Sequence, residues 1–470
     1  MRLSPTLAAD RVSAAALWAV GLSPAVFSVF VWDRVPDTEG VPVDWGSAAA
    51  QPASAPWRID VGLAYASLTI GLLVATLVLA VADTRRTSRS RAGDLLVAAA
   101  VGVYVGPLLS AAVGGHGGVA NWRLWLGPLC VAALYASPEL TLEAMLRRLR
   151  PILRVYTWGS LCALVVAPGW ALTPNDIVNF RLPWMGAARL VGLTDHPIPL
   201  GVMAAAVLAL ELTPLMRSRL WTLHAAAAAA VLLLAQSRTA WIAALVGLPL
   251  IYQRSATRRV SPLLVRGLIT SMACCAAALV PTLATRFGQA LSTPEVSSLH
   301  GRTTVWDLAM SAFRGNPLFG YGPTLFTDPS SPVHGMYAHA HSQIYQTLST
   351  SGLVGAVGLL LFVVVLLATA ARTGAVSAGL TWALVAITLV TCLAEAPLRS
   401  DEFDPFLLLV VADIAVLLAA GRAAAAVEPA GQPVVPAAAP ATGYGRSARS
   451  AANSWSAAGS SSTSRFGSAG

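Results

Sequence analysis

The sequence predicts an all-α membrane protein, a polytopic bundle of about twelve transmembrane helices. The first observation is composition: 56% of the 470 residues are hydrophobic and only 11% are charged, whereas soluble domains carry about 25% charged residues. The second is that the apolar residues form blocks of roughly 18–25, the length that crosses about 30 Å of hydrocarbon. The third is that arginines gather in every second connection between the blocks, as expected for alternating cytoplasmic and outer loops.

The apolar blocks define the predicted spans in order along the chain. The first block is too long for the core of a signal peptide, so we expect it to remain in the protein as a span. The predicted spans cover residues 12–32, 60–82, 94–113, 122–138, 153–171, 198–214, 220–236, 239–253, 262–284, 343–371, 376–396 and 405–421.

Arginine placement predicts the orientation of these spans. The arginine-rich connections are 85–91, 147–150, 217–219 and 254–259, together with Arg372. They belong on the cytoplasmic side, and an even number of spans then places both termini there. The net charge of +9 is explained by these loops, so we expect no nucleic-acid partner.

One connection, residues 285–342, is far longer than the others and is predicted on the outer side. Loops of this length are usually functional or disordered. The stretch "TVWDLAMSAFRG" predicts a helix, with Val305, Leu308, Ala309 and Phe313 on one face, and "GNPLFGYGP" ends it with turn residues. We therefore predict one membrane domain over 1–422, followed by an Ala/Pro- and Ser/Gly-rich disordered cytoplasmic tail over 423–470.

Arginines in three motifs break the positive-inside trend. They are Arg189 in "GAARLVGLTDHPIPLG", Arg238 in "AQSRTAW" and Arg302 in "HGRTTVW". A charge at the membrane face is unfavourable unless it has a partner or a role, and the guanidinium fork suits phosphate oxygens. Each arginine, considered alone, also fits an interfacial or helix-start residue, so both interpretations stay open.

Histidines stand at the entrance to the span predicted at 343–371. In "YAHAHSQIYQTLSTSGLVG", His341 lies directly before the apolar run, where an imidazole can exchange a proton near neutral pH. His339 could join His341 in a metal pair only if the segment is extended. No cysteine or carboxylate cluster lies nearby in the sequence to complete a ligand set, so we expect no metal.

The motifs "QSRTAW", "GRTTVWDLAMSAFRGNPLFGYGP" and "HAHSQIYQTLSTSGLVG", in this order and at these spacings, resemble the Wzy-like O-antigen ligase and O-antigen polymerase family. The resemblance implies a GT-C-like glycosyltransferase of the bacterial cytoplasmic membrane that needs no metal or other cofactor. The implied donor is a glycan on undecaprenyl diphosphate at the outer face. The implied acceptor is a lipid-linked glycan, a lipid or a protein, with membrane lipids as the surroundings.

The resemblance also implies roles for single residues. Arg238 and Arg302 would bind the donor diphosphate with help from Arg189, and His341 would be the catalytic base of an inverting transfer. Ser342 stands where the family usually has Asn, so Ser342 and His339 are candidate supporting residues only.

Ligation and polymerisation cannot be separated by these motifs. The alternative functions are a flippase or transporter of lipid-linked sugars and an inactive scaffold. A transporter should carry polar or broken helices near the bilayer midplane, whereas most of the unusual charges here are predicted at one face. The exceptions that could lie within the membrane are Glu211, Glu395 and Asp413.

Overall fold

A computed structural model describes most of the compact unit Met1–Glu428. The described residues are 5–31, 56–82, 91–114, 122–138, 140–174, 188–254, 302–328, 330–331, 333, 339–399 and 404–427. The span predicted at 262–284 and residues 428–470 of the predicted tail lie outside this set.

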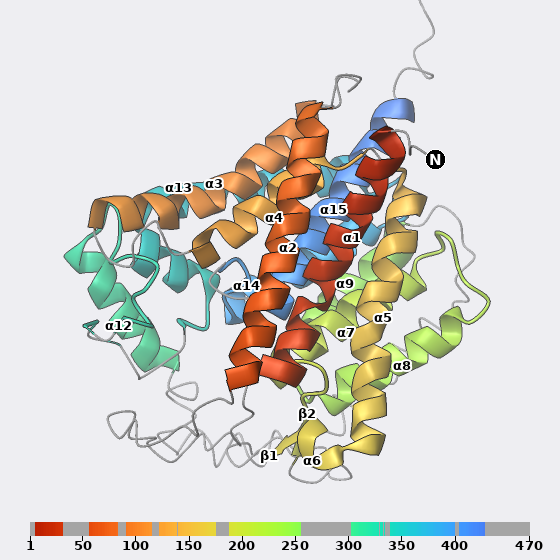
Figure 1. The fold of residues 1–470 in the computed structure, drawn as a ribbon, viewed down its shortest axis with the longest axis horizontal. Coiled ribbons are helices and arrows are strands. Elements are labelled where there is room, and N and C mark those ends of the chain that lie inside the picture. The colour runs from red at the N-terminus through yellow and green to blue at the C-terminus, as the bar shows by residue number, and fades with distance from the viewer. Residues whose placement is uncertain are drawn as a thin grey trace, which may run out of the picture. The chain divides into compact units, whose positions relative to one another are not determined.

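Helices occupy every predicted span that falls within the described residues, which confirms the all-α polytopic membrane class (Figure 1). Among these residues, 6 helices are long and apolar enough to cross a membrane, and shorter apolar helices accompany them. The helices are α1 (Pro5–Val26) with a π-helical turn η1 (Phe27–Val31), α2 (Pro56–Ala82), α3 (Arg91–Gly114), α4 (Leu126–Ala136) after a 3-10 turn η2 (Trp122–Trp125), α5 (Leu142–Val166), α6 (Pro168–Ala171), α7 (Pro197–Leu212), α8 (Trp221–Leu234), α9 (Arg238–Arg254), α12 (Arg302–Gly315), α13 (Gln343–Thr373), α14 (Leu380–Ala394) and α15 (Pro405–Val427).

α5 and α15 are longer than hydropathy predicted. α5 begins at Leu142 rather than at residue 153, because its arginine-rich first turns are amphipathic and fall below the threshold for an apolar block. Its start is capped by Thr141, whose hydroxyl accepts a hydrogen bond from the Ala144 N–H at 3.2 Å. α15 continues to Val427, past the predicted start of the tail at residue 423.

A short antiparallel pair of strands, not predicted from the sequence, follows α6. β1 (Leu172–Pro174) pairs with β2 (Ala188–Leu190), with Thr173 opposite Arg189. In Figure 1 this pair lies at the bottom of the bundle, whereas α1 begins and α15 ends at the top.

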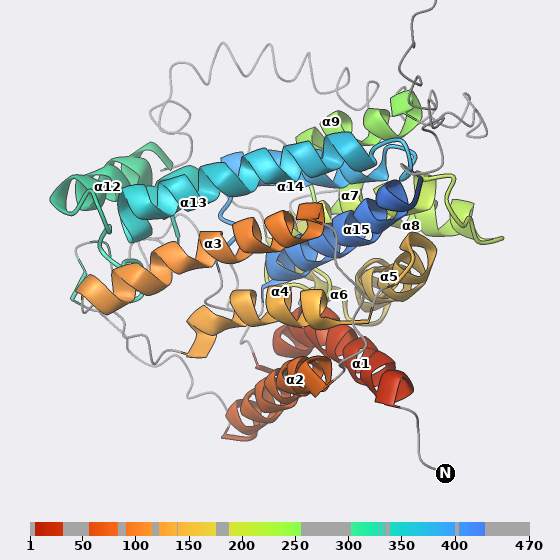
Figure 2. The same cartoon turned by 90° about the horizontal axis from the view of Figure 1, so that it is seen from above.

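α3 and α13 run side by side in both views (Figures 1 and 2), and glycines allow the contact. A Cβ atom on Gly106 would lie 2.7 Å from the Cα of Gly355, and one on Gly358 would lie 2.8 Å from the carbonyl oxygen of Gly102. Small residues at such crossings let membrane helices approach closely, so that van der Waals contacts and weak hydrogen bonds replace the missing hydrophobic effect.

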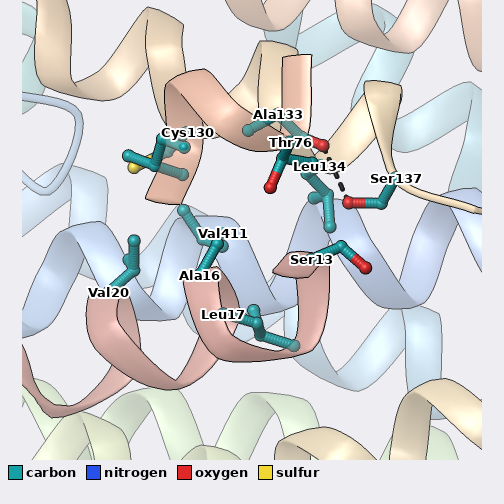
Figure 3. A pocket seen from close by; sticks show the side chains of 11 residues that line it. Ser13, Ala16, Leu17, Val20, Thr76, Cys130, Ala133, Leu134, Ser137 and Val411 are labelled. Carbon is teal, nitrogen blue, oxygen red and sulfur yellow. Dashed lines mark hydrogen bonds between the residues drawn. The ribbon is translucent and has the colours of Figure 1, made fainter. Parts of the chain in front are cut away.

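α1, α2, α4 and α15 enclose a small crevice (Figure 3). Its hydroxyls are bonded within their own helices: Ser13 donates to Asp10 O, Thr76 to Leu72 O and Ser137 to Ala133 O. The remaining lining is apolar, and it includes no residue that the sequence predicts in the site.

Candidate functional site

A buried carboxylate, Glu395, joins residues from two of the predicted motifs. Glu395 is 3% exposed and follows α14 directly. Its Oε1 accepts a hydrogen bond from Nη2 of Arg302 at 3.0 Å. Its Oε2 lies 2.9 Å from Nε2 of His339 and 3.3 Å from Nδ1 of His341. We call these four residues the Glu395 cluster.

His341 adopts a left-handed backbone conformation, with φ at +48°. Non-glycine residues rarely adopt this region, and such strain is concentrated at functional sites. The turn leads into α13 through the N-cap residue Ser342, which is buried but makes no side-chain capping hydrogen bond. Ser342, a predicted supporting residue, therefore directly follows His341 of the Glu395 cluster, and its side chain does not cap α13.

Ala340, between the two histidines, is held by side chains from both neighbouring helices. Its carbonyl oxygen accepts a hydrogen bond from Nε1 of Trp306 at 3.0 Å, and its N–H donates to Oε1 of Gln346 at 2.9 Å. The Trp306 ring stacks on Tyr345 with 4.9 Å between centroids. The tryptophan and glutamine of the motifs thus fix the segment that carries His339 and His341.

The segment after Glu395 is fixed in a similar way. The Glu395 N–H donates to the Thr391 carbonyl oxygen at 2.8 Å and ends α14. Oε1 of Gln343, the first residue of α13, accepts a hydrogen bond from the Leu398 N–H at 2.9 Å. The start of α13 is therefore linked to the segments on both sides of the cluster.

The loop after α12 docks against a break in α13. Gly352 interrupts the helix with φ at +60°, and Gly320 in the loop has φ at +70°. A Cβ on Gly352 would lie 2.5 Å from the backbone of Leu318, and the Tyr321 N–H donates to the Ser349 carbonyl oxygen at 2.8 Å. The glycines of both motifs are thus needed for a close backbone contact that attaches the predicted loop helix to α13.

Arg189 and Arg238 lie on neighbouring segments. Nε of Arg189 donates to the Ala235 carbonyl oxygen at 3.2 Å, and Nε2 of Gln236 donates to the Ala188 carbonyl oxygen at 2.9 Å. Arg238 begins α9 after Ser237 and is exposed. These bonds attach β2 to the turn that presents Arg238.

Electrostatic interactions connect these arginines to the Glu395 cluster. Arg238 interacts with Arg302. Arg189 interacts with His196, which also interacts with Glu395, His341 and His339. Arg238 is therefore near enough to Arg302, and Arg189 to His196, for their charges to interact, and of these three arginines Arg302 is the one that contacts the histidine-bound carboxylate.

The charges within the cluster are set by burial and by hydrogen bonds. Burial, with a contribution from Arg399, lowers the pKa of His339 to about 4. Burial raises the pKa of Glu395, but hydrogen bonds and charge interactions with His339 and His341 outweigh it and hold that pKa well below its usual value. Glu395 is therefore an anion that accepts hydrogen bonds near neutral pH.

The surroundings of the Glu395 cluster favour an anionic ligand. α9 and α12 begin at Arg238 and Arg302, and α7 and α13 begin directly after His196 and Ser342. The N-terminal end of a helix carries partial positive charge. Arg189, Arg238 and Arg302 add three cationic side chains, whereas Glu395 supplies a single negative charge. An anion larger than a carboxylate, with several oxygens, fits this balance.

His339, His341 and Glu395 also offer ligand atoms within 4.8 Å of one another, a set that could hold a transition metal. Arg302 binds the same carboxylate, and its charge opposes that of an added cation.

Sequence reasoning missed Glu395 and His196 as members of this site. Glu395 stood at the edge of an apolar block, where we treated it as a possible intramembrane charge. An acidic residue in an otherwise apolar segment is itself a functional signal, but only folding shows its partners. His196 lies in the same motif as Arg189, on a loop whose basic residues suggest an anionic ligand, but it was not among the predicted site residues.

The comparison with known families agrees with this geometry. Residues 223–360 match the family model described as O-Antigen ligase. The segment 223–360 is thus similar to O-antigen ligases, and we call it the matched segment. The matched segment contains Arg238, Arg302, His339 and His341, whereas Arg189 and Glu395 lie on either side of it. No curated protein matches the chain.

Proposed function

We propose that the protein is a glycosyltransferase that ligates or polymerises glycans carried on undecaprenyl diphosphate at the outer face of the bacterial cytoplasmic membrane. The match of residues 223–360 to the O-antigen ligase model supports the coarser role of a membrane ligase or polymerase acting on lipid-linked glycans. The observation that carries the mechanism is the contact of His341 with the buried carboxylate of Glu395.

The carboxylate defines which nitrogen of His341 is available. An ionised carboxylate only accepts hydrogen bonds, so Nδ1 of His341 carries the proton that faces Glu395. Nε2 then keeps its lone pair and can act as a base. A positioned base of this kind typically contributes about 10²–10⁴ in rate.

The proposed transfer needs only a base and charge neutralisation. The acceptor oxygen attacks the anomeric carbon of the donor sugar and forms a new glycosidic bond. The bond between that carbon and the diphosphate oxygen breaks, and undecaprenyl diphosphate leaves with the electron pair. The acceptor proton passes to Nε2 of His341. Attack from the side opposite to the leaving group inverts the anomeric centre, without a step that needs a metal.

The arginines would neutralise the departing diphosphate. Arg238 is exposed at the start of α9, so it is our first candidate for direct phosphate contact. Arg302 already donates to Glu395 and to the Ala394 carbonyl oxygen, so we assign it a double role of holding Glu395 and adding positive charge. Fixed donors of this kind stabilise charge that develops in the transition state.

The proposed topology places both termini in the cytoplasm and the site outside. The arginine pattern supports it, as does the arrangement in which α1 begins and α15 ends at the end of the bundle opposite to β1 and β2 (Figure 1).

The test is His341→Ala in the native host, with His224→Ala as a matched control. His224 lies in the same matched segment, where its Nδ1 accepts a hydrogen bond from Nε1 of Trp158. We expect His341→Ala to insert normally and to accumulate lipid-linked glycan at the outer leaflet, detected with a probe that cannot cross the membrane. His224→Ala should resemble the unaltered protein. Accumulation at the inner leaflet would instead identify a flippase and overturn the proposal.

A further inference from the structure

His196 links the start of α7 to the Glu395 cluster. It is the N-cap residue of α7, and its Nδ1 accepts a hydrogen bond from the Ile198 N–H at 3.2 Å. Its carbonyl oxygen accepts a hydrogen bond from the Thr194 hydroxyl at 2.9 Å. The imidazole is therefore fixed at the backbone and at one ring nitrogen.

The cap fixes the tautomer of His196. Because Nδ1 accepts a hydrogen bond, the proton of the neutral ring must be on Nε2. Among the described residues, none accepts a hydrogen bond from this Nε2–H. The ring thus presents a donor whose direction is set by the helix.

The sequence of the first turn explains why a side chain carries this donor. Pro197 and Pro199 have no N–H groups, and the N–H of Ile198 is used by His196. The first residues of α7 therefore offer no free backbone donor to a ligand. The imidazole extends the positive end of the helix outward by the width of a ring.

The electrostatic neighbours of His196 are the residues of the proposed active site: Arg189, Glu395, His341 and His339. His196 is therefore near enough to Arg189, a proposed diphosphate ligand, and to His341, the proposed base, for their charges to interact.

We propose that His196 is a further catalytic residue, a neutral hydrogen-bond donor whose Nε2–H binds a phosphoryl oxygen of the departing lipid diphosphate. This inference rests on the proposed glycosyl transfer and deepens it. As the sugar–phosphate bond breaks, negative charge grows on that oxygen, and a fixed donor stabilises it more in the transition state than in the bound donor. The proton stays on His196 throughout, so the balance of the transfer is unchanged.

Burial supports the neutral form of His196. Burial and the nearby positive charge of Arg189 lower its pKa to about 3. The ring is therefore uncharged at physiological pH and can donate without adding a further cation to a site already rich in arginine.

Two substitutions separate the proposed donor from the cap. His196→Asn keeps a polar atom near the position of Nδ1, and Asn is among the best N-cap residues, but its amide does not reach the position of Nε2. His196→Gln places an amide N–H near the position of Nε2 and caps poorly. Donation to the substrate predicts that the Gln variant is more active than the Asn variant, whereas a purely structural cap predicts the reverse.

The experiment uses the purified full chain and lipid-linked glycan extracted from a host strain that lacks the protein. Release of undecaprenyl diphosphate is measured against donor concentration, and folding is checked by thermal unfolding in detergent. We expect kcat of His196→Asn to fall about 10²–10³-fold with KM changed less than about threefold. His196→Gln should keep kcat within about tenfold of the unaltered protein.

The possible failures are distinguishable. A folded His196→Asn variant with unaltered kcat overturns the inference even if the Gln variant does not fold. If the unaltered protein transfers glycan and His341→Ala does not, the proposed function stands whatever the His196 variants do. If the unaltered protein releases no undecaprenyl diphosphate, the proposed function itself fails.

Discussion

Replacement of Glu395 by Gln removes one charge from the centre of the site while keeping the size of the side chain. Oε2 of Glu395 faces Nε2 of His339 and Nδ1 of His341, and Oε1 faces Arg302. A Gln amide can satisfy only part of this set. If the Gln NH₂ group faces the histidines, His341 must switch tautomer and carry its proton on Nε2. If the Gln oxygen faces the histidines, the NH₂ group meets the N–H donors of Arg302.

The magnitude follows from these contacts. A hydrogen bond to a charged group contributes about 1.5–3 kcal/mol, which corresponds to roughly a 10–150-fold change in rate if it acts in the transition state. Loss of the correctly oriented base removes about 10²–10⁴ in rate. We therefore expect Glu395→Gln to lower the release of undecaprenyl diphosphate by about 10²–10⁴-fold.

The matched control is Asp404→Asn. Asp404 is also a buried carboxylate paired with an arginine, Arg399, at 3.2 Å. Its Oδ1 accepts a hydrogen bond from the Phe406 N–H at 2.8 Å, a cap that Asn can keep. This variant should stay within about threefold of the unaltered rate, as expected for a substitution that keeps its cap. A folded Glu395→Gln protein with a rate as high as that of Asp404→Asn would refute the reasoning that Glu395 orients His341.

Further predictions concern the fold, the donor site and acid stability. Gly352→Ala should destabilise the protein by more than about 1–2 kcal/mol, because φ is +60° and the new Cβ would overlap Leu318; Gly71→Ala, with nothing within 4 Å, should have little effect on the unfolding temperature. Arg238→Gln should raise KM for the extracted donor about tenfold or more, as expected for loss of a charge-assisted phosphate contact, and an unchanged KM would remove Arg238 from the donor site. The pKa of His339 is lowered to about 4 in the folded protein, whereas that of histidine in an unfolded chain is about 6.5. Between these two pH values the unfolded chain therefore binds a proton at this residue and the folded chain does not. Stability should fall in this window by up to about 1.4 kcal/mol per pH unit, and His339→Asn should flatten the dependence of unfolding temperature on pH.

The sequence by itself determined the class of the protein and the candidate base and arginines. Apolar blocks of bilayer length leave the backbone no alternative to helices, because unpaired N–H and C=O groups are unfavourable in hydrocarbon. The composition therefore sufficed for the fold class. The resemblance of the motifs to the O-antigen ligase and polymerase family pointed to Arg189, Arg238, Arg302 and His341, whereas polarity alone left the role of each arginine open.

Tertiary structure alone decided which polar groups meet. Glu395 lies 54 residues beyond His341 along the chain, and no local periodicity joins the end of α14 to the start of α13. The break at Gly352 was likewise not predicted from hydropathy, because the predicted span 343–371 continues through it. Such contacts depend on long-range packing, in which a buried charge must find partners to offset its lost hydration. For this reason the sequence could suggest the base, whereas only the fold could supply the carboxylate that orients it.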